Sequence, residues 1–429
     1  MLSLDMIRRD PAFVMAGLAK RDADLSLDRI LELDTRRRQL ISEVDSLRAI
    51  RNEESKRIGQ LMRGGPETTD EAEAAKNRVR EVNEKLEAVE EESKAVEASL
   101  NDELLWLPNL PIEDVPVGLD EEANVVARVE GEEFTLPFPA VPHWDLAETL
   151  DIIDFQTGAS LSGSRFYMLK GAGARLQRAL ITWMLDVHTQ EHGYTEIYPP
   201  YLVRREALLG SGNLPKFGDN LYHDEEDDLW LIPTAEVPLT GMHAGQILEP
   251  GILPRYYTAA TPCFRREKAA AGRDTRGIKR VHQFDKVEMY KFVAPEDSDE
   301  ELRKLMGDAE DLLRRLGLTY RLLELCTGDM GFPSAKSFDF EVWSPGCAEW
   351  LEVSSCSNCT DFQARRSNIR FRRERGGRPE FVHTLNGSGL AIPRIMIAIL
   401  ETYQQADGSV EIPAVLQPYT GYSRLEPAK

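Results

Sequence analysis

The sequence predicts an α+β protein in which an N-terminal antiparallel coiled-coil hairpin precedes a domain built on an antiparallel β-sheet flanked by helices. Three observations predict this fold class. Apolar residues repeat with coiled-coil spacing in two successive segments, a Gly-Gly-Pro turn separates these segments, and strand-like runs lie between helical segments in the rest of the chain. We expect residues 1–110 to form the first domain and residues 111–429 the second.

The hairpin is expected over residues 27–104, with helices at about 27–62 and 69–104. Apolar residues in both helices fall on alternating three- and four-residue steps, which is the pattern of a coiled-coil seam. Gly64, Gly65 and Pro66 supply helix-breaking turn chemistry between them. At 1.5 Å rise per residue, such helices would be roughly 50 Å long. The seam residues are Ile30, Leu33, Leu40, Val44, Leu47, Ile58 and Leu61, then Val79, Val82, Leu86, Val89, Val96 and Leu100.

Charged residues interrupt the seam, and prolines end it. Arg37, Arg51 and Glu54 stand where apolar residues are expected, so they either fix the register of the helix pair or leave a bend. The stretch Leu107–Pro116 is rich in proline, which cannot donate a helix hydrogen bond. We therefore expect a linker there.

The second domain is expected to hold largely antiparallel strands between helices. Neither a GxxxxGK[ST] loop nor a GxGxxG fingerprint occurs, so any nucleotide phosphates must be bound by side chains. The strand-like runs are Leu229–Ile232, Lys286–Val293, Ser337–Val342 and Trp350–Val353.

Net charge limits the classes of partner. With 52 Lys and Arg against 73 Asp and Glu, the formal net charge is −21, which argues against nonspecific coating of nucleic acid. A nucleic acid would have to meet a local basic patch, or else the basic residues of the hairpin form an ordinary solvated helix face. The candidate patch is Arg36, Arg37, Arg38, Arg48, Arg51, Lys56 and Arg57.

The cysteines and the hydropathy pattern bear on location. The chain has 5 cysteines, an odd number that fits reduced thiols better than a disulfide framework. No run approaches the roughly 18 apolar residues of a membrane span, and the N-terminal residues lack the layout of a signal peptide. We expect a cytoplasmic protein with no membrane partner.

The segment Phe264–Glu288 concentrates the chemistry of the second domain. Arg265 and Glu267 lie two residues apart, which on a strand places both side chains on one face. An arginine fork suits a phosphate, and a carboxylate can accept from an exocyclic amine such as that of adenine. A second strand is expected from about His282 to Phe292. The loop between the strands carries Arg273, Asp274, Arg276, Lys279 and Arg280.

This hairpin resembles motif 2 of the class II aminoacyl-tRNA synthetases, and in detail that of the seryl-tRNA synthetases. Further segments that resemble the family follow its order over essentially the whole chain. They are GYTEIYPPYLV at Gly193–Val203 for motif 1, PTAEVPLT at Pro233–Thr240 for serine binding, EVSSCSNCTDFQARR at Glu352–Arg366, and NGSGLAIPR at Asn386–Arg394 for motif 3.

The resemblance implies ATP and Mg²⁺ sites. Arg265 would bind the α-phosphate, Glu267 the adenine amine, and Phe284 the face of the adenine, while Arg280 and Arg394 would hold the outer phosphates. Arg265, Arg280 and Arg394 are thus the expected catalytic residues. Glu352 and Ser355 would ligate Mg²⁺ with the oxygen atoms that this cation prefers. The full expected ATP set is Arg265, Arg266, Glu267, Arg280, Val281, Phe284, Glu352, Val353, Ser354, Ser355 and Arg394.

The resemblance also implies a serine site and assigns no role to two other candidates. A pocket of hydrogen-bonding groups would reject alanine, because its buried polar atoms would remain unpaired. Cys356 and Cys359 form a CxxC without a second ligand pair, so no structural zinc is expected. His282 is expected to be structural. The serine-binding set is Thr234, Ala235, Glu236, Glu288 and Ser388.

The resemblance implies a homodimeric serine–tRNA ligase that forms seryl-adenylate from L-serine and ATP and then charges tRNA(Ser), with tRNA(Sec) open as a second acceptor. The hairpin would contact the tRNA backbone. Three alternatives stay open at this point: a specialised copy serving biosynthesis or inhibitor resistance, transfer of serine to a carrier protein, and a noncatalytic scaffold. ATP–pyrophosphate exchange and tRNA charging distinguish them.

Overall fold

The computed structural model describes residues 1–21, 25–63, 69–268 and 276–428. The chain divides into two compact units. We call Leu2–Ala16 with Asp24–Leu107 the arm unit, and Met1, Gly17–Ala23 and Pro108–Lys429 the sheet unit. Each unit is described by itself. Within the described residues, no helix has the length and apolar character needed to cross a bilayer.

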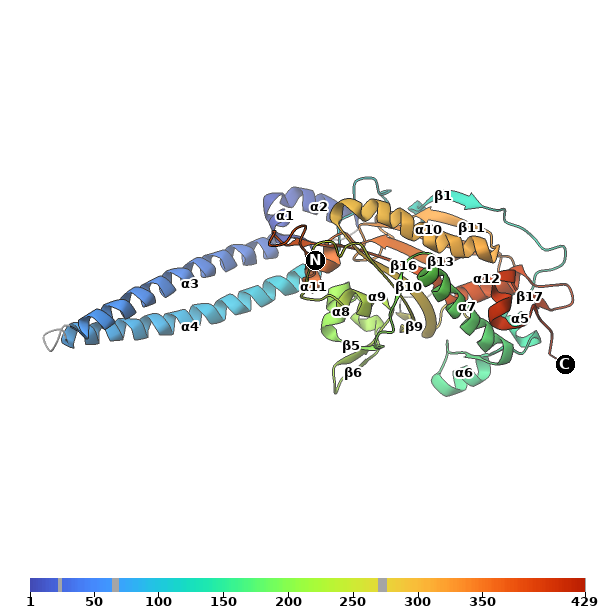
Figure 1. Ribbon diagram of the computed structural model, residues 1–429, viewed down its shortest axis with the longest axis horizontal. Coiled ribbons are helices and arrows are strands. Elements are labelled where there is room, and N and C mark those ends of the chain that lie inside the picture. The colour runs from blue at the N-terminus through green and yellow to red at the C-terminus, as the bar shows by residue number, and fades with distance from the viewer. Residues whose placement is uncertain (22–24, 64–68, 269–275, 429) are drawn as a thin grey trace. The chain divides into compact units, whose positions relative to one another are not determined.

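Two long helices, α3 (Asp28–Leu61) and α4 (Thr69–Leu105), make up most of the arm unit and lie side by side (Figure 1). Their bounds lie close to the expected 27–62 and 69–104. The turn residues Gly64, Gly65 and Pro66 lie outside the described residues. The predicted seam residues are all buried or half-buried, so the heptad pattern identified the contact face correctly. Two short helices, α1 (Leu4–Arg9) and α2 (Pro11–Lys20), precede the pair.

One of the three charged seam positions, Glu54, links the two long helices. Glu54 of α3 forms an ion pair with Arg78 of α4 across the seam, with 3.8 Å between Arg78 Nε and Glu54 Oε1, and a second ion pair with Arg57 within α3 at 4.0 Å. Arg37 instead turns along its own helix to Asp34, at 3.4 Å. These contacts favour a role in fixing the register of the pair.

The sheet unit is built on a sheet that has eight strands among the described residues, in the order β1-β11-β12-β13-β16-β10-β9-β4. All neighbours are antiparallel except β4 and β9, which confirms the largely antiparallel sheet expected from the sequence. The strands are β1 (Val125–Glu130), β4 (Thr195–Glu196), β9 (Arg255–Phe264), β10 (Gln283–Val293), β11 (Tyr320–Glu324), β12 (Lys336–Ser344), β13 (Glu349–Asn358) and β16 (His383–Ala391).

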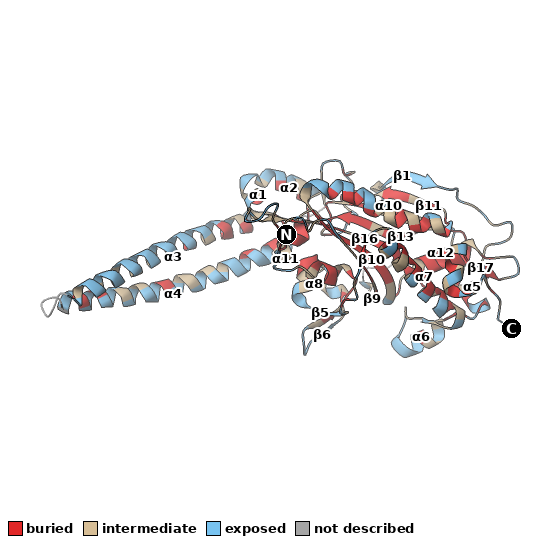
Figure 2. Cartoon of the chain, viewed as in Figure 1, coloured by how far each residue is buried: buried red, intermediate tan, exposed pale blue. Residues whose placement is uncertain are grey.

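Three helices, α7 (Gly171–Gln190), α10 (Ser298–Leu316) and α12 (Ile392–Thr402), pack against this sheet, and their buried faces form the main core (Figure 2). Strand β10 shows how the sheet separates core from site. Val287 and Met289 enter the helix-covered core, whereas Glu288 lines a cavity. This follows from the two-residue repeat of a strand, whose successive side chains point to opposite faces.

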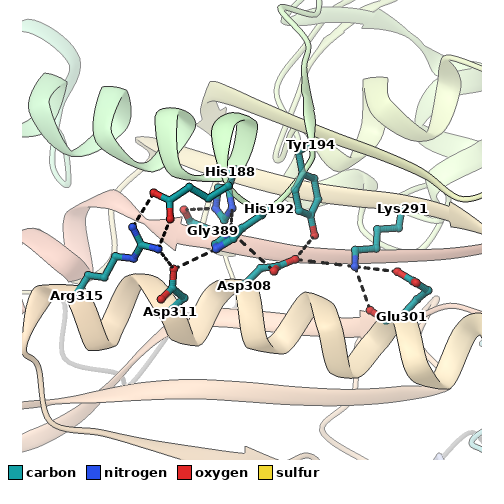
Figure 3. Close-up of polar contacts among 10 residues, drawn as sticks. His188, His192, Tyr194, Lys291, Glu301, Asp308, Asp311, Arg315 and Gly389 are labelled. Atoms are coloured by element: carbon teal, nitrogen blue, oxygen red, sulfur yellow. Dashed lines mark hydrogen bonds and ion pairs between the residues drawn. The ribbon is translucent and has the colours of Figure 1, made fainter.

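A polar network fixes α10 to the helix-covered face of the sheet (Figure 3). The Lys291 Nζ atom on β10 lies 3.0 Å from Glu301 Oε2 and 3.9 Å from Asp308 Oδ2, both on α10. Tyr194 donates to Asp308 at 2.8 Å. Burial lowers the pKa of Lys291, and the two carboxylates oppose that shift. The lysine is fully buried, so its charge depends on these partners.

Shorter elements complete the sheet unit, and several of them position the cavity. The helices are α5 (His143–Thr149), α6 (Phe155–Ser162), α8 (Arg205–Ser211), α9 (Glu236–Gly241), α11 (Phe362–Ser367) and α13 (Gln417–Thr420). The strands are β2 (Ile153–Asp154), β3 (Met168–Leu169), β5 (Leu202–Arg204), β6 (His223–Asp224), β7 (Leu229–Leu231), β8 (Ile247–Leu248), β14 (Arg370–Phe371), β15 (Glu380–Phe381), β17 (Val410–Glu411) and β18 (Arg424–Leu425).

Candidate active site

A cavity of about 510 Å³ opens on the face of the sheet opposite the main core. Its walls come from segments far apart in the sequence, including the residues that follow β9, the first half of β10, strands β13 and β16, and the starts of α9 and α12. Most of the residues predicted from sequence for ATP and serine line this cavity. They are Thr234, Glu236, Arg265, Glu267, Arg280, Val281, Phe284, Glu288, Glu352, Ser355, Ser388 and Arg394.

Four predicted site residues do not line the cavity. The guanidinium of Arg266 lies over the ring of Tyr222, 4.6 Å from its centroid. Ala235 and Val353 are buried in hydrophobic clusters. The hydroxyl of Ser354 donates to a backbone carbonyl of β16 at 2.6 Å. These four side chains pack or form hydrogen bonds outside the cavity, and each is next in the sequence to a residue that lines it.

Arg265 and Glu267 both face the cavity, but the prediction that they do so as residues on one face of a strand is wrong. Strand β9 ends at Phe264, so the two residues follow the strand, and Glu267 adopts a φ of 47°. His282 fixes the segment that follows β9 through two contacts with Arg265. The His282 carbonyl accepts from the Arg265 backbone N–H at 2.9 Å, and His282 Nδ1 lies 3.0 Å from the Arg265 carbonyl oxygen. His282 thus has the structural contacts expected of it. The loop residues Arg273 and Asp274 lie outside the described residues.

Arginines and carboxylates pair along one side of the cavity. The Arg394 guanidinium lies 3.2 Å from Glu352 Oε2 and donates to the Glu352 carbonyl at 2.7 Å. Arg280 lies 3.6 Å from Glu267. Arg265 lies over Phe284, with 5.2 Å between the guanidinium carbon and the ring centroid. This side therefore combines positive charge with an aromatic face, as binding of a nucleotide requires.

A β-bulge explains how Glu352 and Ser355 share one wall. Residues three apart on a regular strand face opposite sides of the sheet, but the register of β13 against β12 shifts between Phe340 and Glu341. Desolvation at the cavity wall opposes ionisation of Glu352. Nearby guanidinium groups, with Arg394 the strongest, outweigh it and lower the pKa of the carboxyl. The Glu352 carboxyl is therefore ionised at neutral pH.

Asp339 adds a carboxylate beside this pair, because it is the register partner of Ser355. Within the described residues its Oδ1 atom is buried and has no hydrogen-bond partner. Burial, and then the charge of Glu352, raises the pKa of Asp339 well above its usual range. Glu352, Ser355 and Asp339 together offer only oxygen atoms, the donors that a hard divalent cation such as Mg²⁺ prefers.

The other end of the cavity is a pouch of hydrogen-bonding groups. The Thr234 hydroxyl donates to Glu288 Oε2 at 2.8 Å, and Lys286 Nζ lies 2.5 Å from the same oxygen. Ser388 is the register partner of Glu288 on β16. Thr234 also accepts from the backbone N–H of Glu236 at 3.2 Å. The pouch is polar, which suits a small hydroxylated ligand.

Two residues that the sequence analysis left without a role hold Glu236. Gln363 donates to Glu236 Oε1 at 2.6 Å, and Asn386 donates to the same atom at 3.1 Å. Burial, and then the charge of Glu288, raises the pKa of Glu236 to about 7. Both holding residues lie inside motifs quoted from the sequence, but only the fold brings them to this carboxylate.

On the arm unit, several predicted basic residues already pair with acids. Arg36 lies 2.6 Å from Glu92, and Arg48 lies 2.7 Å from Glu90, so both bridge α3 and α4. Asp34 is buried and accepts from Arg8, Arg37 and Arg38. Arg57 pairs with Glu54, while Arg51 is half-buried and Lys56 is exposed. A polyanion would have to compete with these acids for the arginines.

Family models match both parts of the chain. Residues 1–111 match the seryl-tRNA synthetase N-terminal domain, and residues 219–403 match the class II tRNA synthetase core domain of the G, H, P, S and T enzymes. A serine–tRNA ligase of Thermomicrobium roseum is 62% identical over 98% of this chain and 94% of its own. One from Chloroflexus aurantiacus is 54% identical over 98% of both chains.

Solved structures give the same family. Seryl-tRNA synthetase from Pyrococcus horikoshii, complexed with ATP, is 41% identical with a TM-score of 0.91, and the match covers 100% of both chains. The cytoplasmic serine–tRNA ligase of Naegleria fowleri, in complex with AMP, is 31% identical with a TM-score of 0.86 over 100% of this chain and 99% of the other. The chain therefore belongs to the seryl-tRNA synthetase family of class II aminoacyl-tRNA synthetases.

Proposed function

We propose that the cavity catalyses both steps of the reaction of its family: L-serine and ATP give seryl-adenylate and pyrophosphate, and the seryl group then passes to the 3′ end of tRNA(Ser). One observation carries this proposal. Three arginines from separate segments, Arg265, Arg280 and Arg394, line the same cavity as the polar pouch formed around Glu288. This arrangement can hold a triphosphate beside a small amino acid.

The ATP end works by positioning and charge. Arg265 is assigned to the α-phosphate, where negative charge develops as the serine carboxylate oxygen attacks and pyrophosphate leaves. Arg280 and Arg394 hold the outer phosphates. Phe284 contacts the face of the adenine, and Glu267 accepts from its amine. Fixed positive groups lower the barrier without a protein nucleophile, because they need no rearrangement as charge builds.

Magnesium is assigned to Glu352 and Ser355, whose oxygen atoms line the cavity near Arg394. When bound there, the cation supplies positive charge to the phosphates. The oxygen-only donors and the neighbouring Asp339 carboxylate support this assignment. The Glu352 carboxylate also orients Arg394, so one side chain serves both the cation and the arginine.

The serine end selects its ligand by hydrogen bonding. Glu236 and Glu288 supply two carboxylates for the ammonium and hydroxyl groups, and Thr234 and Ser388 supply hydroxyls. Alanine would leave at least one of these buried groups without a partner, which costs about 1–3 kcal/mol.

A matched pair of assays tests the function. The full chain should support serine-dependent ATP–pyrophosphate exchange and should charge purified tRNA(Ser). A chain lacking residues 27–104 should keep the exchange reaction and lose charging, because the arm unit is assigned to the tRNA. No exchange by folded full-length protein would contradict the enzymatic proposal. Undiminished charging by the shortened chain would contradict the role of the arm alone.

We also propose that the protein is a cytoplasmic homodimer. The segment Gly193–Pro200 includes strand β4 at the edge of the large sheet, and the Tyr198 side chain there is 83% exposed. An exposed aromatic beside a sheet edge favours association. Light scattering should give twice the chain mass of 48.4 kDa, and Tyr198→Glu should shift the protein toward that single-chain mass. A single-chain mass for the unaltered protein would contradict the dimer.

A further inference from the structure

A cluster of three side chains, buried His143 and Glu401 with half-buried Cys347, lies in the sheet unit, outside the set of residues that line the cavity. His143 is the first residue of α5, Cys347 lies in the turn between β12 and β13, and Glu401 lies near the end of α12. His143 and Glu401 are fully buried. Their potential ligand atoms all lie within 4.8 Å of one another.

Hydrogen bonds define what the imidazole does. The backbone N–H of Ile278 donates to His143 Nε2 at 3.1 Å, and His143 Nδ1 lies 2.9 Å from Glu401 Oε1. Because Nε2 accepts, the ring proton is assigned to Nδ1, which donates to the carboxylate. The ring therefore connects a side chain of α12 to the backbone of Ile278.

Glu401 is held by protein donors alone. It accepts from the backbone N–H groups of His143 at 2.8 Å, Gly346 at 2.9 Å and Cys347 at 3.0 Å. The Ser344 hydroxyl and the Cys347 thiol also donate to it. A carboxylate has about four lone-pair sites, so these donors saturate it. Such an anion stays fixed in position and does not require a metal ion.

Ile278 begins the segment Ile278–Val281, all of which lines the cavity and which carries Arg280. The segment approaches the imidazole so closely that a Cβ atom on Gly277 would lie 1.9 Å from His143 Nε2. Gly277 also has a φ of 65°, which favours glycine. Trp144, next to His143, lies beneath the Lys279 ammonium at 5.3 Å. The start of α5 thus holds this segment through both backbone and side chain.

One helix therefore governs two phosphate-binding arginines. Helix α12 carries Arg394 near its start and Glu401 about two turns later. Arg394 reaches the cavity directly, whereas Glu401 acts on the Arg280 segment through His143 and Ile278. Helix α12 is thus connected to both arginine-bearing segments.

We propose that His143 and Glu401 are positioning residues, which anchor the Arg280 segment for binding of ATP. The inference rests on the proposed function, because ATP is taken as the ligand of the cavity. In this anchor, the imidazole donates one hydrogen bond to Glu401 and accepts another from the backbone N–H of Ile278. Two substitutions of His143 each keep one of these hydrogen bonds and remove the other. His143→Asn keeps a donor at the Nδ1 position but has no atom to reach Ile278. His143→Gln keeps an acceptor at the Nε2 position.

Steady-state exchange kinetics and melting temperature test the anchor. His143→Asn should raise the KM for ATP about tenfold, the effect of an unsatisfied buried N–H, and leave the KM for serine within about twofold. His143→Gln should leave the KM for ATP within about threefold of wild type. Both should melt below wild type. Equal KM values for ATP in the two variants, or a parallel rise in the KM for serine, would overturn the proposal.

Control variants keep the test decisive. Cys347→Ser retains a donor to Glu401 and does not touch Ile278, so its KM for ATP should be unchanged. Glu401→Gln keeps the size of the side chain and removes its charge, and it should raise the KM for ATP selectively. This variant replaces His143→Asn as the test if His143→Asn does not fold. A normal KM for ATP in Glu401→Gln would overturn the anchor. Absence of exchange in wild type would instead refute the proposed function.

A metal measurement on the wild-type protein distinguishes the anchor from a metal site built from the same three side chains. Purified protein analysed for zinc should contain far less than one equivalent, and treatment with a chelator should leave the KM for ATP unchanged. One equivalent of bound zinc, whose removal raises the KM for ATP, would overturn the hydrogen-bonded anchor.

Discussion

At the scale of single residues, the serine pouch depends on two neighbouring carboxylates with different environments. Glu288 accepts from Thr234 and lies beside Lys286. Glu236 is held by amide donors, and burial together with Glu288 raises its pKa to about 7. Such a carboxylate changes charge in the physiological range, so occupancy of the pouch by a cation should depend on pH.

We predict that the KM for serine falls as pH rises from 6 to 8, because the serine ammonium binds the ionised form of Glu236. The effect of pH on the free energy of unfolding has the opposite sign. Folding raises the pKa of Glu236 from 4.5 to about 7, so without ligand this group lowers stability as the pH rises between these two pKa values. Exchange kinetics across this range test the first effect. Glu236→Gln should lose the pH step, and a step retained in that variant would assign it elsewhere.

Adjacent arginines offer a matched test of the phosphate site. Arg265→Ala should lower the rate of adenylate formation by a factor of about 10²–10³, as expected for losing one donor to developing charge. Arg266→Ala should retain a rate close to wild type, because its guanidinium stacks on Tyr222 outside the cavity. Single-turnover formation of seryl-adenylate measures both. Equal losses would show that the assignment of Arg265 is wrong.

At the scale of elements, helix α10 is attached to β10 through buried charge. Lys291 reaches Glu301 and Asp308, and the network extends along α10 to Asp311 and Arg315 (Figure 3). The same strand presents Glu288 to the serine pouch, three residues before Lys291. Attachment of α10 therefore stabilises the strand that presents Glu288.

Removing Lys291 should cost more stability than removing a lysine that contacts the same carboxylate from the surface. Lys291→Met leaves Glu301 and Asp308 without their buried partner, and we expect a loss of about 3 kcal/mol in the free energy of unfolding. Lys304→Met removes a half-exposed partner of Glu301 and should change stability little. Chemical denaturation followed by tryptophan fluorescence compares them. Equal losses would contradict the importance of burial.

At the scale of the whole molecule, a chain with a net charge of −21 must bind a polyanion through local basic residues. The arm arginines are partly neutralised by Glu90, Glu92 and Asp34. A phosphate that displaces one of these acids replaces an arginine–carboxylate ion pair with an arginine–phosphate ion pair. The gain in binding free energy is only the difference between the two. Lys56 is exposed on α3, so a phosphate can reach it without such a competition.

We predict that Lys56→Ala weakens tRNA binding and lowers the slope of log affinity against log salt concentration by about one, the value for one lost phosphate contact. Serine-dependent exchange should be unchanged, because Lys56 belongs to the arm unit. Filter binding at several salt concentrations measures the slope. Lys304→Met, on the sheet unit, serves as the control. An unchanged slope in Lys56→Ala would exclude this contact.

Local pattern was sufficient for much of the fold. The heptad seam predicted α3 and α4 closely because it depends only on the repeat of apolar residues along one helix face. Strands such as β10 and β12 followed from their apolar and β-branched runs. Strand geometry does not account for the shared direction of Arg265 and Glu267, because β9 ends at Phe264, before both residues, and Glu267 has a positive φ.

The order of residues along the chain specifies the chemical groups that are present: arginines, carboxylates and hydroxyls in motifs that resemble one family, preceded by a coiled-coil hairpin. Which of these groups come into contact depends on the fold. Gln363 and Asn386 converge on Glu236, and His143 links Glu401 to Ile278, across long separations in the chain. Strand register, a β-bulge and helix packing set those contacts, and none of these is a property of a local segment.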